Sequence, residues 1–262
     1  MNATPLTDKI AVVTGGASGI GEACARLLAA RGARVAVADI NGAAANAVAT
    51  EIGGMAIELD VSDEQSVADL VTRTETDLGP CDVLVTSAGL VQPPLPPGDL
   101  SMDLYDRIVA VNLRGTYLCV RAFGERMVAR QTGAIVTISS ITAERSVPLH
   151  AYAPTKAAVT NLTMGLAAEW GRAGVRVNTI EPGYVLTPAI RDQIDKGHRD
   201  PTLLAENSCL GRMIDPDEIA KAVAFLVSDE ASAVTGIALP VDAGFFCAGS
   251  WAPYGGVRTH GA

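Results

Sequence analysis

Short apolar runs alternate with longer alanine-rich segments along nearly the whole chain. The runs are rich in β-branched residues and lack polar alternation, as is typical of strands buried on both faces. They span Ile10–Thr14, Val35–Ala38, Val83–Thr86, Ala134–Ile138, Val175–Ile180 and Ile237–Leu239. Segments with Ala, Leu and Val at helical spacing lie between them, at 21–31, 43–52, 62–78, 113–130, 153–172 and 217–228. This alternation predicts an α/β fold, with a doubly wound parallel sheet of about seven strands and helices on both faces.

The same rhythm indicates one domain over residues 1–262, because no linker, charge block, low-complexity tract or internal repeat interrupts it. Two segments depart from it. Residues 90–100 contain four prolines, which exclude a helix and predict a stiff loop. The polar residues 187–212 contain two prolines and two glycines and predict a loop or small helical flap. Both follow C-terminal strand ends, where doubly wound sheets bind ligands.

Charge and cysteine usage limit the partners and the compartment. The chain has 20 basic and 29 acidic residues, a formal net charge of −9, which argues against nucleic acid or an anionic membrane as partner. Five scattered cysteines without a C-x-x-C pair predict reduced thiols in a cytoplasmic protein. Residues 1–9 lack signal-peptide features, and no run approaches the length of a membrane span. The three histidines, His150, His198 and His260, lack metal-ligand spacing, so we expect no metal site.

A glycine-rich turn joins the first predicted strand directly to the first predicted helix. Glycines permit a tight turn and close approach of the backbone to a pyrophosphate, which then lies at the positive end of the helix. The spacing is G-x-x-x-G-x-G rather than the usual G-x-G-x-x-G, so a glycine turn without a ligand is the alternative. The residues expected to contact a dinucleotide here are Gly15, Ser18, Gly19, Ile20 and Gly21.

Two acidic positions follow predicted strands and suit the adenosine half of that cofactor. Asp39 lies 18 residues after Gly21, where a carboxylate accepts hydrogen bonds from ribose hydroxyls. No Arg or Lys near it offsets repulsion of a 2′-phosphate, so NAD is favoured over NADP. The alternative is an Asp that only caps the turn before Asn41. Asp60 and Val61 end the next short strand and are placed to face adenine, although their sequence also suits a helix N-cap.

Tyr152 and Lys156 are four residues apart at the start of a predicted helix, so their side chains share one face. A nearby ammonium lowers the pKa of a tyrosine and makes it a general acid/base near neutral pH. Ser139 and Ser140 end the fifth predicted strand, where a hydroxyl can hold a substrate oxygen beside the tyrosine. Serines at a strand end are otherwise usually caps.

Together these motifs resemble the short-chain dehydrogenase/reductase family over about residues 8–244. The matching features are the glycine turn, Ser87-Ala88-Gly89, Asn112, Ser139-Ser140, Tyr152-x-x-x-Lys156, Pro182-Gly183 and Thr187. The resemblance implies a Rossmann-like dinucleotide-binding catalytic domain. It also implies that Tyr152 is the catalytic acid/base and that Lys156 binds the nicotinamide ribose and lowers the tyrosine pKa. Ser140, the second serine of the pair, would orient the substrate, and Asn112 would hold a water linking Lys156 to solvent.

The resemblance also implies further cofactor contacts and a homotetramer. The contacts would come from Ser87, Ala88, Gly89, Pro182, Gly183, Val185 and Thr187, and the tetramer would use the helices beginning near Asn112 and Tyr152. Two motifs depart from the family: its Asn-Asn-Ala-Gly is here Thr86-Ser87-Ala88-Gly89, and its Asp-Gly-Gly is Asp242-Ala243-Gly244. Neither departure touches the reacting atoms.

The sequence therefore predicts an NAD-dependent oxidoreductase that interconverts a secondary alcohol and a ketone by hydride transfer. The polar flap favours a polyol, sugar or small hydroxy compound. One alternative, an NADPH-dependent carbonyl or 3-oxoacyl reductase, would need a basic residue near Asp39. Another, a non-catalytic NAD-binding sensor or scaffold, would be expected to lack Tyr152 or Lys156. The aromatic tail, residues 248–262, fits packing on a neighbouring subunit, covering its active site, or fraying.

Overall fold

The computed structural model describes residues 5–258 and contains one parallel sheet of seven strands. The strand order is β3-β2-β1-β4-β5-β6-β7, so the chain winds outward from β1 in one direction and then from β4 in the other. The strands are β1 Ile10–Thr14, β2 Arg34–Asp39, β3 Met55–Glu58, β4 Val83–Thr86, β5 Gly133–Ile138, β6 Val175–Pro182 and β7 Ala238–Val241. The predicted Rossmann-like sheet is confirmed, and its ligand crevice is expected where β1 and β4 diverge.

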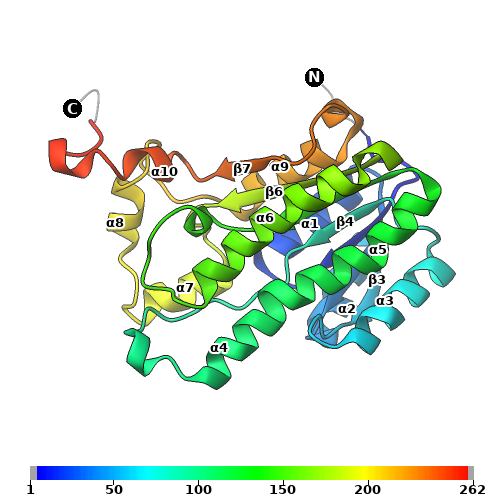
Figure 1. Ribbon diagram of the computed structural model, residues 1–262, viewed down its shortest axis with the longest axis horizontal. Coiled ribbons are helices and arrows are strands. Elements are labelled where there is room, and N and C mark those ends of the chain that lie inside the picture. Colours follow the sequence, from blue (N-terminus) through cyan, green and yellow to red (C-terminus); the bar gives the residue numbers. More distant parts are fainter. Residues whose placement is uncertain (1–4, 259–262) are drawn as a thin grey trace.

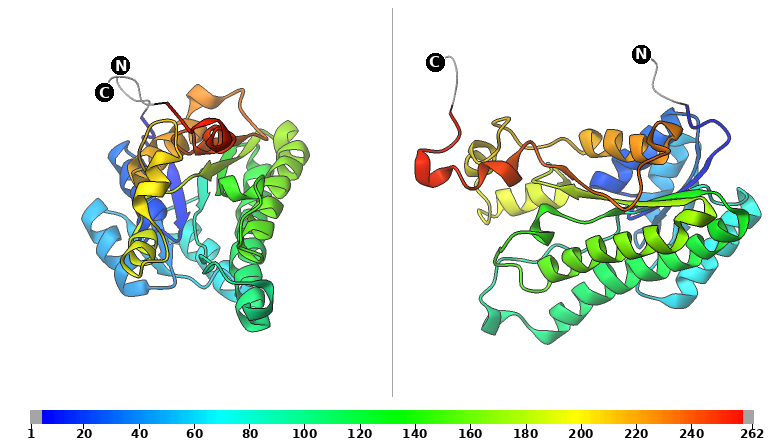
Figure 2. Two further views of the ribbon diagram at one scale, coloured as in Figure 1. Left: turned by 90° about the vertical axis from the view of Figure 1, so that its left-hand side faces the viewer. Right: turned by 45° about the horizontal axis from the view of Figure 1, so that its top comes forward.

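Helices cover both faces of this sheet (Figures 1 and 2). One apolar layer joins the sheet to α1 Gly19–Ala30, α2 Gly42–Ile52 and α9 Pro216–Val227. The other joins it to α3 Glu64–Asp77, α5 Thr116–Arg130 and α6 Tyr152–Trp170. The central strand β1 serves both layers: Ala11 and Val13 pack in the first, and Val12 packs in the second. Burial on both faces explains why its sequence is apolar without alternation.

Several element boundaries differ from the sequence prediction. The helix expected over 113–130 begins at Thr116, after α4 Met102–Val109 and a π-helical segment Ala110–Gly115 that were not foreseen. β7 begins one residue after Ile237, whose amide donates to Asn178 Oδ1. The expectation that residues 90–100 contain no helix is wrong at one place, where Pro97–Asp99 forms a 3₁₀ turn. Proline is tolerated there because the first residue of a helix needs no N–H partner.

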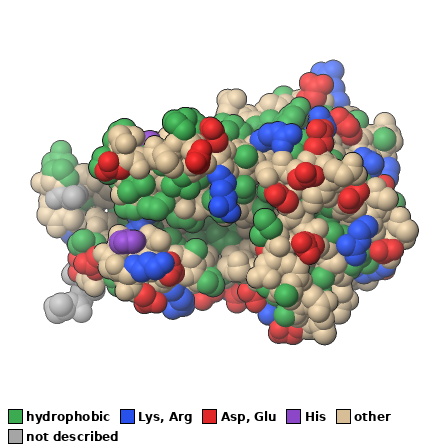
Figure 3. Space-filling model, turned by 90° about the horizontal axis from the view of Figure 1, so that it is seen from below, with side chains coloured by type: hydrophobic (Ala, Val, Ile, Leu, Met, Phe, Trp, Pro, Cys, Tyr) green, Lys and Arg blue, Asp and Glu red, His purple; other side chains and the backbone are tan. Residues whose placement is uncertain are grey.

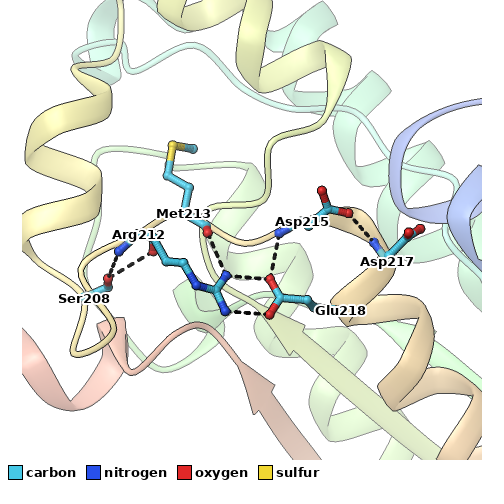
Figure 4. A network of polar contacts seen from close by, with 6 residues as sticks. All are labelled: Ser208, Arg212, Met213, Asp215, Asp217 and Glu218. Atoms are coloured by element: carbon cyan, nitrogen blue, oxygen red, sulfur yellow. Dashed lines mark hydrogen bonds and ion pairs between the residues drawn. The ribbon is translucent and has the colours of Figure 1, made fainter.

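The predicted flap contains two short helices, α7 Pro188–Asp195 and α8 Pro201–Glu206. Its far end is fixed to α9 by a network of polar contacts (Figure 4). Arg212 Nη1 and Nη2 each donate to a carboxylate oxygen of Glu218 at 2.7 Å, and Glu218 also accepts from the Asp215 amide at 3.0 Å. These donors lower the pKa of Glu218 to about 2. The flap therefore leaves the sheet after Pro182 and returns at a firmly anchored helix start.

The last described segment forms α10 Phe245–Ala248 and a 3₁₀ turn, Ala252–Tyr254. Trp251 is 47% exposed and Tyr254 is 87% exposed. The predicted tail contacts its own chain through α10, while these two aromatic side chains extend into solvent. The tail's last four residues, with His260, and residues 1–4 at the other end lie outside the described residues.

Candidate active site

A cleft of about 450 Å³ opens at the C-terminal ends of the strands. It brings together the glycine turn, the ends of β2 and β4, the start of α6 and the first residues of the flap. The predicted site residues that line it are Gly15, Ser18, Gly19, Ile20, Asp39, Asp60, Val61, Ser87, Ala88, Gly89, Ser140, Tyr152, Lys156, Pro182, Gly183, Val185 and Thr187. Gly21 and Asn112 do not line it. Figure 3 shows the molecule from below, where hydrophobic side chains gather around a hollow near the middle of the face.

The glycine turn is packed too tightly for side chains. A Cβ at Gly21 would lie 2.0 Å from the Gly15 carbonyl oxygen, so Gly21 supports the turn from behind. Gly15 has φ +66°, and a Cβ there would lie 2.6 Å from the Ala88 backbone. Ser18 is the N-cap of α1, and its side chain makes no capping hydrogen bond. The first amides of α1 therefore lack a side-chain cap at the cleft, as a pyrophosphate site requires.

Asp39 both lines the cleft and stabilises the turns around it. Its carboxylate accepts from the Ala17 amide at 3.1 Å and from the Asn41 amide at 3.0 Å. The turn-capping role considered as an alternative is thus present together with access to the cleft. Asp60 follows β3 and accepts from the Ser62 amide at 2.8 Å, while Asp63 caps α3.

Tyr152 and Lys156 lie together at the buried start of α6. Lys156 Nζ is 5.6 Å from the centroid of the Tyr152 ring and donates to the Ile138 carbonyl at 2.7 Å. Burial lowers the pKa of Lys156 to about 8. Burial raises the pKa of Tyr152, whereas interactions with Ser140 and with the charge of Arg199 lower it. The predicted downward shift from Lys156 is wrong for this structure, because the loss of hydration outweighs the neighbouring donors and charges.

The two serines after β5 have different surroundings. Ser139 Oγ donates to the Lys156 carbonyl at 2.8 Å and lies 2.8 Å from Thr160 Oγ1. Thr160 donates in turn to buried Glu181, whose pKa is raised by burial. Ser140 Oγ accepts from the Thr142 amide and interacts with the Tyr152 phenol. The Ser139 hydroxyl is therefore engaged in hydrogen bonds that support α6. The Ser140 hydroxyl is the one available to interact with the Tyr152 phenol.

Asn112 lies in the π-helical segment behind the cleft. Its side chain accepts from the Leu90 amide at 2.8 Å and donates to the Leu90 carbonyl at 3.0 Å. A Cβ on Gly89 would lie 3.5 Å from Asn112 Oδ1 and 3.8 Å from Lys156 Nζ. Asn112 thus fixes the loop after β4 beside Lys156; its role in holding a water stays a prediction.

The sequence prediction missed several residues of this site, among them Gln92 and Arg107. Gln92 is fully buried, and its Oε1 accepts from the amides of Ala151 and Tyr152 at 2.8 and 3.0 Å, which fixes the start of α6. Arg107 of α4 is the one cationic lining residue besides Lys156 among the described part of the chain. A Gln within a proline-rich loop and an Arg in an unforeseen helix gave no sequence signal.

Residues 5–258 contain neither a membrane-spanning helix nor a metal-binding cluster. No helix there is long and apolar enough to cross a membrane. No group of three or more His, Cys, Asp or Glu side chains in that range is arranged to hold a metal ion.

Comparisons with known proteins agree with this geometry. A family model described as Enoyl-(Acyl carrier protein) reductase matches residues 15–246. The chain is 40% identical to cis-4-hydroxycyclohexanecarboxylate dehydrogenase of Sinomonas cyclohexanicum, over 91% of this chain and 96% of that protein. It is also 40% identical to D-threitol dehydrogenase of Mycolicibacterium smegmatis, over 92% of this chain and 94% of that protein.

Two solved structures match this chain over more than nine-tenths of its length. A structure described as ribose-5-phosphate isomerase from Brucella melitensis 16M is 47% identical with a TM-score of 0.97, covering 98% of this chain and 100% of that one. A 3-ketoacyl-(acyl-carrier-protein) reductase from Brucella melitensis, complexed with NADH, is 34% identical with a TM-score of 0.85, covering 92% and 99%. The chain therefore belongs to the short-chain dehydrogenase/reductase family.

Proposed function

We propose that this protein is an NAD-dependent oxidoreductase that interconverts a secondary alcohol and a ketone. One observation carries the proposal: a single cleft joins the glycine turn and Asp39 to Ser140, Tyr152 and Lys156. This arrangement would hold a dinucleotide beside an acid/base group in the same cleft. One domain performs both tasks, with residues 187–212 as the substrate flap and residues 248–262 as a tail.

The lining residues fit a nicotinamide dinucleotide because the turn has no room for side chains where a pyrophosphate would lie. Asp39 would accept from the adenosine ribose, and Asp60 and Val61 would face adenine. Nicotinamide chemistry supplies or removes the hydride once the cofactor is bound. The contacts to its two halves would come from Gly15, Ser18, Gly19, Ile20, Ser87, Ala88, Gly89, Pro182, Gly183, Val185 and Thr187, with Gly21 supporting the turn.

The chain's own residues would manage the proton. In alcohol oxidation, Tyr152 as phenolate removes the hydroxyl proton, and in ketone reduction its phenol returns one. Ser140 holds the substrate oxygen beside Tyr152. Lys156 binds the nicotinamide ribose and, with Asn112 and its water, connects the tyrosine to solvent. Because burial raises the pKa of Tyr152, this scheme needs a positive charge near the phenol when the enzyme is loaded.

The choice of NAD over NADP rests on the Asp39 carboxylate in the cleft, and a relative's complex with NADH supports it. Arg107 is a basic lining residue that could favour NADP instead. We expect wild-type kcat/KM to be higher with NAD, and Asp39→Ala to raise activity with NADP by about tenfold or more, since it removes repulsion of the 2′-phosphate. Arg107→Ala is the matched control. The assignment of NAD would be contradicted if the wild type preferred NADP and Arg107→Ala abolished that preference.

The substrate class is proposed as a polyol, sugar or small hydroxy compound. The polar flap supports it, as do relatives named for threitol and hydroxycyclohexanecarboxylate. Offering such compounds, 3-oxoacyl thioesters and sterols with either cofactor, and following absorbance at about 340 nm, tests the class. Turnover confined to 3-oxoacyl thioesters with NADPH would favour the reductase alternative. Tight NAD binding without turnover would favour a sensor.

The neighbour described as an isomerase raises a second candidate, isomerisation of a sugar phosphate. That reaction moves protons without net oxidation, so it would leave the absorbance at about 340 nm unchanged. Conversion of ribose 5-phosphate without added cofactor would support it. The cofactor-shaped cleft favours the dehydrogenase.

Assembly and location complete the proposal. We expect a homotetramer built partly through α5 and α6, which expose Tyr117 and Met164 at 42% and 46%. Sedimentation analysis tests it, and a monomer at micromolar concentration would contradict it. We also propose a cytoplasmic location, which the free cysteines support.

A further inference from the structure

The flap carries an arginine that forms no ion pair with any residue of the described range 5–258. Arg199, between α7 and α8, is partly buried, and its Nε is buried without a hydrogen-bond partner. Within residues 5–258, no hydrogen bond or ion pair of its guanidinium is found. Its Cζ lies 5.6 Å from the centroid of the Tyr184 ring, so one face of the guanidinium is held by an aromatic side chain.

Tyr184 connects this guanidinium to the edge of the cleft, although neither of the two side chains is among the lining residues. Tyr184 lies between Gly183 and Val185, which both line the cleft with Tyr152. Its ring packs edge-on against Phe245 of α10, with centroids 4.9 Å apart, which limits its movement. The charge of Arg199 reaches the phenol, since it lowers the pKa of Tyr152. Arg199 would therefore meet a substrate bound at Tyr152 only at the distal end of that substrate, outside the residues that line the cleft.

The absence of an acidic partner for the Arg199 guanidinium is unfavourable and calls for an electrostatic explanation. The chain has a net charge of −9, which disfavours approach of an anion, and a partly buried cation without a counter-ion loses hydration. A substrate carboxylate would form a bidentate, charge-assisted pair with Arg199. That pair would offset the repulsion of the anion by the net negative charge and would replace the hydration that the guanidinium has lost. We propose that Arg199 is an anion subsite that selects substrates bearing a carboxylate remote from the reacting hydroxyl. The inference rests on the proposed alcohol dehydrogenase function and names its substrate class as hydroxy acids.

Binding of unreactive probes tests the subsite separately from turnover. Cyclohexanecarboxylate and cyclohexanecarboxamide share a skeleton and differ in charge, and neither carries a hydroxyl to oxidise. With the NADH-loaded enzyme, we expect the carboxylate to bind roughly 10- to 100-fold more tightly than the amide, as a hydrogen-bonded ion pair would provide. Arg199→Met should remove that difference, and Arg199→Lys should keep part of it.

Arg191→Met, on α7 of the same flap, is the matched control and should preserve the difference. Equal binding of the two probes to the wild type, or an unchanged difference in Arg199→Met, would overturn the subsite. If the proposed function itself is wrong, the absorbance at about 340 nm will not change with any alcohol or ketone offered, because no cofactor is reduced or oxidised.

A second, independent observation concerns two exposed cysteines. Cys209 at the end of the flap and Cys247 in α10 have their sulfurs 3.3 Å apart, and each thiol also lies 3.3 Å from the Gly244 carbonyl. The Leu210 amide donates to the Ala243 carbonyl at 3.0 Å, so the two segments are already in register. A disulfide requires sulfurs about 2.05 Å apart, which side-chain rotation can provide at this separation.

We propose that Cys209 and Cys247 form an intramolecular disulfide on oxidation, fastening the flap to α10. With hydrogen peroxide, the two S–H bonds and the O–O bond break, one S–S bond forms, and two water molecules carry away both thiol protons. The hydrogen bond with Cys247 raises the pKa of Cys209, so mildly alkaline pH favours the reaction.

Thiol counting and peptide mapping after peroxide treatment test this site. We expect a loss of two titratable thiols per chain, one Cys209–Cys247 cross-link, and full recovery with dithiothreitol. Buried Cys24, Cys81 and Cys119 should stay reduced. Cys209→Ser and Cys247→Ser should each form no intramolecular link. Separate sulfenic or sulfinic products on the two cysteines of the wild type, without a link, would overturn it.

Discussion

At the scale of single residues, the site depends on groups whose chemistry is set by burial. The spacing of Tyr152 and Lys156 predicted that they share one helix face, whereas Ser140 was chosen over Ser139 from the family resemblance. The sequence could not identify the direction of the Tyr152 pKa, because that depends on hydration in the folded state. Gln92 was missed for a related reason: it reaches the start of α6 from a loop, and loop conformation has no sequence period.

The phenol of Tyr152 should resist ionisation in the cofactor-free protein. Burial raises its pKa above the ordinary value near 10, so little tyrosinate should form on it below that pH. Ultraviolet difference titration of the wild type against Tyr152→Phe measures this directly. Binding of the cationic oxidised cofactor should shift the titration to lower pH. A tyrosinate signal assigned to Tyr152 below about pH 9 without cofactor would contradict the assignment of burial as the main cause.

Lys156 should make stability depend on pH in the alkaline range. Its folded-state pKa of about 8 lies below the ordinary 10.5, so the unfolded chain binds more protons between these values. The contribution of this group to the free energy of unfolding therefore rises with pH from about 8 to 10.5, by roughly 3 kcal/mol. Urea unfolding of the cofactor-free wild type should show the rise. Lys156→Met should lack it, and an identical pH dependence in both proteins would contradict the shift.

At the scale of elements, α10 connects three segments that surround the site. Phe245 packs on Tyr184, Phe246 lies under the Arg145 guanidinium at 4.0 Å, and Cys247 meets Cys209. These partners come from the turn after β6, the segment before α6 and the flap. The sequence marked the tail as unusually aromatic but could not predict its contacts, since they join positions far apart in the chain.

The turn that leads into α10 contains a strained alanine. Ala243 has φ +54°, where an L side chain is disfavoured, and it replaces the glycine of the family motif. Ala243→Gly should raise the free energy of unfolding by up to about 1 kcal/mol, because relief of strain exceeds the added flexibility of the unfolded chain. The midpoint of urea unfolding measures this.

Ala47→Gly, at an exposed position inside α2, is the control and should lower stability by about 0.5–1 kcal/mol. Equal destabilisation by both substitutions would show that Ala243 is not strained. Activity of Ala243→Gly should stay near that of the wild type, since Ala243 does not line the cleft.

At the scale of the whole molecule, the alternation of strands and helices determined the fold class because central strands such as β1 and β4 are buried by both helix layers. The sheet order and the crevice between β1 and β4 follow from right-handed crossovers between parallel strands. The π-helical segment and α4 were not predictable in this way, because their helical pattern runs continuously into α5.

The central claim is that Tyr152 performs proton transfer in a nicotinamide-dependent reaction within the cleft. The most direct test compares turnover at about 340 nm, with a substrate accepted by the wild type, between Tyr152→Phe and Tyr117→Phe on the surface of α5. We expect Tyr152→Phe to lose activity by at least about 100-fold while still binding NADH, and Tyr117→Phe to keep it. Activity of Tyr152→Phe within a few-fold of the wild type would contradict the account.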